Sequence, residues 1–154
     1  MKYTVALDKD PDALTKFSLG IDGQEVWIGD PCYILRGNEE WSKVCDTLPL
    51  NCCNGCVLAI TLRDSLHKIF VCQTAYGDGC YPVLVDGDEI GAAGVDAGLL
   101  CIATNELATL LRDMFKDSSY RCGVVTRPLH AKKIVAGGGN FSLGNVSVRT
   151  DGEE

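Results

Sequence analysis

Short apolar runs separated by Gly, Asp and Asn make up most of the chain. This pattern predicts strands joined by turns. A hairpin turn is predicted at Asp86-Gly87-Asp88, and a hairpin loop is predicted from Gly137 to Asn140. Residues 63–68 are expected to connect two strands. The predicted strands are 1–7, 24–28, 57–62, 69–74, 81–85, 89–95, 98–102, 121–126, 132–136 and 145–150.

Two segments follow a helical period instead. Residues 104–116 carry apolar positions at i, i+3, i+4, i+7 and i+8, and Thr104 or Asn105 can cap the helix they predict. Residues 38–48 predict a second helix, which Pro49 ends. The apolar positions of the predicted helix over 104–116 are Leu107, Leu110, Leu111, Met114 and Phe115, of which Leu107, Leu111 and Met114 are expected in the core.

Strands and helices do not alternate regularly, so we predict an α+β fold with a mostly antiparallel β-sheet and two helices. The chain has 154 residues, a typical length for one domain, and 46% of them are hydrophobic. We therefore expect one domain over residues 1–150, followed by a polar tail over residues 151–154.

The charge balance narrows the classes of partner. The chain has 21 acidic and 14 basic residues, a net charge of −7, which argues against a broad nucleic-acid-binding face. No apolar run approaches the length of a membrane span, and the first residues lack the apolar core of a signal peptide. We expect a protein of the cytoplasm that contacts neither nucleic acid nor membrane.

Nine cysteines are expected to be reduced and mostly buried, because their number is odd and no export signal is seen. Cys53, Cys56, His67 and Cys72 have a spacing that resembles a zinc site. The strand predicted between Cys56 and His67 argues against a finger loop, so we predict neither a metal nor a cofactor.

Two turn motifs and one later segment are the candidate sites. Gly29-Asp30-Pro31-Cys32-Tyr33 ends a predicted strand in an X-Pro turn. In Tyr76-Gly77-Asp78-Gly79-Cys80-Tyr81-Pro82-Val83, glycines on both sides of an aspartate allow the backbone to approach a ligand. Val95-Asp96-Ala97-Gly98 could bring a further carboxylate to Asp78. Each motif is also explained by turn geometry alone.

Together these motifs resemble a set of small uncharacterised proteins from bacteria and their phages. Those proteins carry a G-D-P-x-Y-like turn, a Y-G-D-G-x-Y-P-V-like turn and a later D-x-G. The resemblance covers mainly residues 26–102 and implies no activity. What it implies is a prokaryotic or phage origin, and for a phage protein the cytoplasm of the host.

We interpret the chain as a non-enzymatic small-ligand-binding protein that sequesters, for example, a nucleotide-like signal. Tyrosines would stack on the ligand. One alternative is a carboxylate- or metal-dependent hydrolase, and another is a regulatory protein that acts through one protein partner. The oligomeric state stays open, a homo-oligomer included. The expected ligand-binding residues are Asp30, Tyr33, Tyr76, Asp78, Tyr81 and Asp96.

Overall fold

The computed structural model of the chain describes residues 3–35, 55–75, 77–95, 98–115, 123–131, 134–137 and 139–150. In chain order its elements are β1 (Tyr3–Leu7), α1 (Ala13–Ile21), β2 (Val26–Gly29), the 3-10 helix η1 (Pro31–Tyr33), β3 (Cys56–Leu62), β4 (Ser65–Gln73), β5 (Gly79–Val85), β6 (Asp88–Val95), β7 (Leu99–Thr104), α3 (Asn105–Phe115), β8 (Val124–Val125), β9 (Val135–Gly137), β10 (Asn140–Leu143) and β11 (Val146–Val148).

The strands form two sheets. A six-stranded sheet has the order β1-β3-β4-β7-β2-β8, and a five-stranded sheet has the order β6-β5-β11-β10-β9. All neighbouring strands are antiparallel. The α+β prediction with mostly antiparallel strands is therefore confirmed, but the strands are divided between two sheets.

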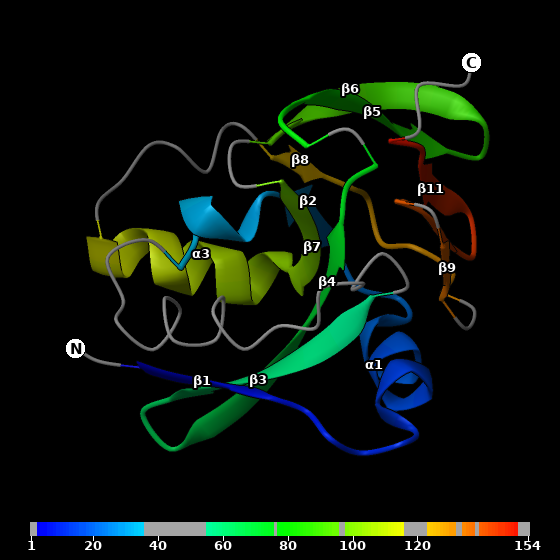
Figure 1. Ribbon diagram of the computed structural model, residues 1–154. Helices are drawn as coiled ribbons and strands as arrows, with labels where there is room; N and C mark the ends of the chain where they lie inside the picture. Colours follow the sequence, from blue (N-terminus) through cyan, green and yellow to red (C-terminus); the bar gives the residue numbers. More distant parts are fainter. Residues whose placement is uncertain are drawn as a thin grey trace.

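The six-stranded sheet is the middle layer of the molecule (Figure 1). One of its faces packs against α3 and η1, and the other packs against α1 and the five-stranded sheet. Side chains alternate between these two faces along each strand, as the period of a β-strand requires. On β3, for example, Val57 belongs to the core on the α1 side and Leu58 to the core on the α3 side.

Helix α3 confirms the predicted helix over 104–116. Leu107 and Leu111 are fully buried, whereas Leu110 is 42% exposed and lies away from the core. The Thr104 hydroxyl accepts a hydrogen bond from the backbone N–H of Leu107 and so caps the helix, as predicted. The side chains of Met114 and Phe115, the predicted helix 38–48 and the polar tail lie outside the described residues.

Helix α1 was not predicted, although its buried residues have a helical spacing. Ala13, Phe17 and Ile21 are at i, i+4 and i+8 and are all buried. Ser18 is buried too: its hydroxyl donates to the carbonyl of Leu14 and accepts the backbone N–H of Ile134. The helix therefore supports the backbone just before β9.

Two predicted connections are wrong in extent. The turn between β3 and β4 contains only Arg63 and Asp64, and β4 already begins at Ser65. Arg63 adopts a φ of 56°, which lets the chain reverse over two residues. The loop predicted at 137–140 is also shorter, because Gly137 ends β9 and Asn140 begins β10. Among the described helices, none has both the length and the apolar character to cross a membrane.

Candidate functional site

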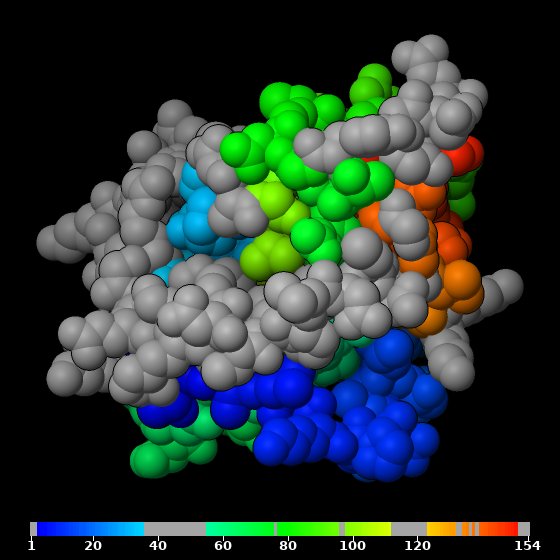
Figure 2. All heavy atoms as spheres, viewed as in Figure 1, coloured from blue at the N-terminus to red at the C-terminus, as the bar shows by residue number. Residues whose placement is uncertain are grey.

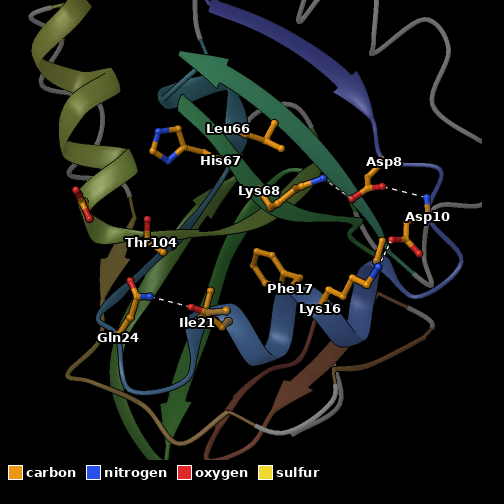
Figure 3. Close-up of a pocket in the computed structure, with 13 residues that line it drawn as sticks. Asp8, Asp10, Lys16, Phe17, Ile21, Gln24, Leu66, His67, Lys68 and Thr104 are labelled. Atoms are coloured by element: carbon orange, nitrogen blue, oxygen red, sulfur yellow. Dashed lines mark hydrogen bonds and ion pairs between the residues drawn. The ribbon is translucent and has the colours of Figure 1, made fainter. Parts of the chain in front are cut away.

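A pocket of about 350 Å³, here called the α1 pocket, lies beside α1 at the start of β4. Residues that follow β1, the last residue of β7 and the first turn of α3 complete its lining. Figure 3 shows two lysine–aspartate pairs at one side of the pocket and other polar side chains at the opposite side, with Phe17 and Ile21 between them.

The floor of the α1 pocket is apolar. Phe17 and Ile21 lie one turn apart on α1 and are only 4% and 3% exposed. Phe17 also packs on Phe70 of β4, with 6.4 Å between ring centroids. Leu66 lines the same pocket but is 61% exposed, so it offers apolar surface that the fold itself does not cover.

Two ion pairs occupy one side of the α1 pocket. The Lys68 ammonium lies 2.7 Å from an Asp8 carboxylate oxygen, and Lys16 lies 2.5 Å from Asp10. The hydrogen bond from Lys68 holds the pKa of Asp8 below its usual value, aided by the backbone N–H of Asp10. Lys16 likewise lowers the pKa of Asp10, and this carboxylate raises the pKa of Lys16. Both lysines therefore already hold a carboxylate.

The other side of the α1 pocket carries polar groups of different kinds. His67, Gln24 and Thr104 are seen there in Figure 3, and Glu106 in the first turn of α3 also lines the pocket. The Gln24 amide donates to the carbonyl of Gly20, which closes the C-terminal end of α1. These groups offer a ligand both donors and acceptors beside an apolar floor.

The predicted binding turns lie at the opposite end of the same strands. Lys68, near the start of β4, is at the pocket, whereas Gln73 ends β4 opposite Leu99, the first residue of β7. Five residues of a strand span roughly 16 Å. β2 ends at Gly29 opposite Cys101, so its turn is at this far end too. Figure 2 shows η1 (light blue), the start of β7 (yellow-green) and residues near 78 (green) on one face.

Asp30 and Tyr33 are buried in this far end. Asp30 is 0% exposed, and its carboxylate accepts the backbone N–H of Cys32 at 2.9 Å, which caps η1. Tyr33 is 8% exposed and packs in the core on the α3 side. Both residues thus shape the turn, and their expected contact with a ligand stays a prediction.

The second turn motif is better exposed. Asp78 is exposed, and Tyr81 is half-buried with its hydroxyl donating to the carbonyl of Gly77 at 2.9 Å. Gly77 also approaches Gly98, because a Cβ built on Gly98 would lie 3.9 Å from the Cα of Gly77. Thr74 joins the two segments, since its hydroxyl contacts the carbonyl oxygens of both glycines. The structure thus brings two of the sequence motifs together at their backbones.

Tyr76 and Asp96 lie outside the described residues, so their expected roles stay predictions. Within the part of the chain that is described, no three His, Cys, Asp or Glu residues are grouped to hold a metal ion. Two of the residues with the zinc-like spacing lie at different positions along the sheet, because Cys56 pairs with Val71, whereas His67 pairs with Ile60. Cys56 and Ile60 are four positions apart along β3, which corresponds to roughly 13 Å.

Five of the nine cysteines are described, and none of these five forms a disulfide bond. Cys72 and Cys101 are buried, Cys32 and Cys56 are half-buried, and Cys80 is exposed. Burial is the main cause that raises the pKa of the Cys101 thiol well above its usual value. This thiol is therefore poorly suited to act as a nucleophile.

Comparisons of the chain with protein families, with curated proteins and with solved structures found no match. The α1 pocket was missed at the level of sequence because its lining has no local motif. Phe17, Lys68 and Glu106 come from three elements far apart along the chain. The spacing of Ala13, Phe17 and Ile21 was the one signal that could have revealed α1, and with it one wall of the pocket.

Proposed function

We propose that this chain binds a small molecule without catalysing its conversion, and that the ligand occupies the α1 pocket. The observation that carries the proposal is the pocket itself, about 350 Å³ in volume with a buried apolar floor and polar groups on two sides. Small-molecule sites in proteins have this construction. The exposed Leu66 adds apolar surface that a ligand would remove from water.

The described lining favours binding over turnover. It contains neither serine nor cysteine, and the Thr104 hydroxyl is engaged in capping α3. Both lysines are paired with aspartates, which fixes their positions and occupies their charges. The hydrolase alternative needs carboxylates that meet, but Asp30 is fully buried in its turn and Asp78 is exposed in another.

The far-end turns have a different part in this proposal. Asp30 and Tyr33 stabilise the fold around η1, where the buried Asp30 carboxylate caps the helix. Asp78 and Tyr81 keep their expected contact with a ligand as a second, separately testable prediction. A bacterial or phage origin, implied by the turn motifs, belongs to the same proposal.

Gly20 offers a clean way to test the pocket. It lines the α1 pocket, and an added Cβ would meet no atom within 4 Å. Gly20→Phe should therefore fill the pocket, whereas Gly20→Ala leaves it open and serves as the matched control. Helical preference favours either residue over glycine, so neither change should unfold α1.

The assay is native mass spectrometry of protein from a cell lysate, followed by thermal melts with nucleotides and other metabolites. We expect wild type and Gly20→Ala to retain and be stabilised by the same molecule, and Gly20→Phe to lose both effects. Loss in Asp78→Ala instead, with Gly20→Phe unaffected, would move the site to the far-end turns. No retained molecule and no stabilisation by any compound would favour the protein-partner alternative.

A further inference from the structure

The charge of the α1 pocket is not balanced on all sides. Asp8 and Asp10 are paired with Lys68 and Lys16, so these four charges cancel in pairs. Glu106 lines the same pocket from the first turn of α3. Among the described residues no cationic side chain pairs with its carboxylate. The pocket thus presents one acid that its own lysines do not neutralise.

A second, shallower hollow of about 530 Å³ adjoins the α1 pocket. The two hollows share Gln24 and Glu106, which stand on the boundary between them. Glu25 lines the second hollow, and none of the described Lys, Arg or His residues does. Leu110 and Pro128 provide its apolar surface. A ligand that passes from one hollow to the other meets carboxylates and apolar surface on its path.

An anionic ligand would find no unpaired lysine among the described residues that line the α1 pocket. A phosphate or carboxylate could approach Lys16 or Lys68 only by competing with an aspartate already at hydrogen-bond distance. It would also be repelled by Glu106, and the whole chain carries a net charge of −7. A cation meets the opposite situation, because Glu106 gains a partner and both ion pairs stay intact.

We propose that the ligand of the α1 pocket is an organic cation, a primary amine or guanidinium carried on an apolar body. The apolar body lies on Phe17 and against Leu66, and the cationic group lies at Glu106. A longer cation extends past Gln24 toward Glu25 in the second hollow. This inference rests on the proposed function of the pocket. The ligand it describes is a cation and therefore differs from the nucleotide-like signal expected from the sequence.

Three small probes with the same ring test the charge preference: benzylamine, benzyl alcohol and benzoate. Each is titrated at millimolar concentrations into ¹⁵N-labelled protein, and affinities and binding positions are read from amide chemical shifts. We expect benzylamine to bind most tightly and benzoate most weakly. The shifts should centre on α1 and on the first turn of α3.

Two neutralising variants then assign the effect to one carboxylate. Glu106→Gln should weaken benzylamine about two- to five-fold, the range of an exposed ion pair, and leave benzyl alcohol unchanged. Glu89→Gln removes the same charge from an exposed position on β6, outside both hollows, and should bind all three probes as wild type does.

The outcomes separate the two proposals. The cation preference is overturned if benzoate binds most tightly, or if Glu106→Gln and Glu89→Gln have equal effects on benzylamine binding. In either case the pocket proposal still holds if Gly20→Phe prevents the binding of benzyl alcohol. Binding of all probes to Gly20→Phe as to wild type shows that the α1 pocket is not their site, and both proposals fail. Both also fail if no probe shifts any amide.

Discussion

Two adjacent leucines of α3 provide a sharp test of how the six-stranded sheet is covered. Leu111 is fully buried in the core on the α3 side, whereas Leu110 is 42% exposed. Leu111→Ala removes roughly three methylene-sized groups, worth about 2–3 kcal/mol in transfer from water. The cavity that remains adds to this, because the surrounding side chains relax only partly, so we expect a loss of about 3–4 kcal/mol.

Urea unfolding followed by circular dichroism measures this loss. A domain of this size changes its melting temperature by about 2–4 °C per kcal/mol, so the loss should lower the melting temperature by about 6–16 °C. Leu110→Ala is the matched control and should cost less than about 1 kcal/mol, since this side chain is already partly in water. The assigned face of α3 is refuted if Leu111→Ala costs less than about 0.5 kcal/mol, or if the two variants lose equal stability.

Three further changes test other parts of the structure. Ser18→Ala should cost about 1–3 kcal/mol in urea unfolding, because the backbone N–H of Ile134 loses its buried acceptor, and an unchanged midpoint would contradict that bond. Gly144→Ala should prevent stable folding, since its φ is +64° and a Cβ would lie 1.7 Å from the carbonyl oxygen of His130; a wild-type melting curve would contradict this. Asp8→Asn should cost less than about 1 kcal/mol at pH 7, as its ion pair is partly exposed. Because folding lowers the pKa of Asp8, this difference should persist above about pH 5 and shrink below about pH 4, and a difference that grows in acid would contradict the assignment.

The parts of the fold that sequence could predict are those encoded locally. The helical period through Leu107 and Leu111 identified α3, and Asp86-Gly87-Asp88 identified the hairpin of β5 and β6. The division into two sheets could not be predicted, because a hairpin has the same local pattern in either sheet. Only packing separates them, as when residues of both sheets share the core on the α1 side.

The candidate site was harder to predict than the fold for a similar reason. Turn motifs such as Gly29 to Tyr33 stand out in the sequence because turns need particular residues, whether or not they bind anything. The α1 pocket is lined by ordinary residues of helices and strands, such as Phe17 and Lys68, whose proximity depends on the sheet order. Conspicuous local chemistry and a usable cavity are therefore separate properties of this chain.

The two ends of the sheet also differ in what a ligand would have to displace. At the far end, the Asp30 carboxylate is fully buried and already accepts a backbone N–H, so a ligand that contacts Asp30 would have to open the cap of η1. At the α1 pocket, Glu106 and the exposed Leu66 meet a ligand without breaking any bond of the fold. Binding at the α1 pocket therefore costs no free energy for breaking these contacts of the fold, which is the physical reason to look for the ligand beside α1 first.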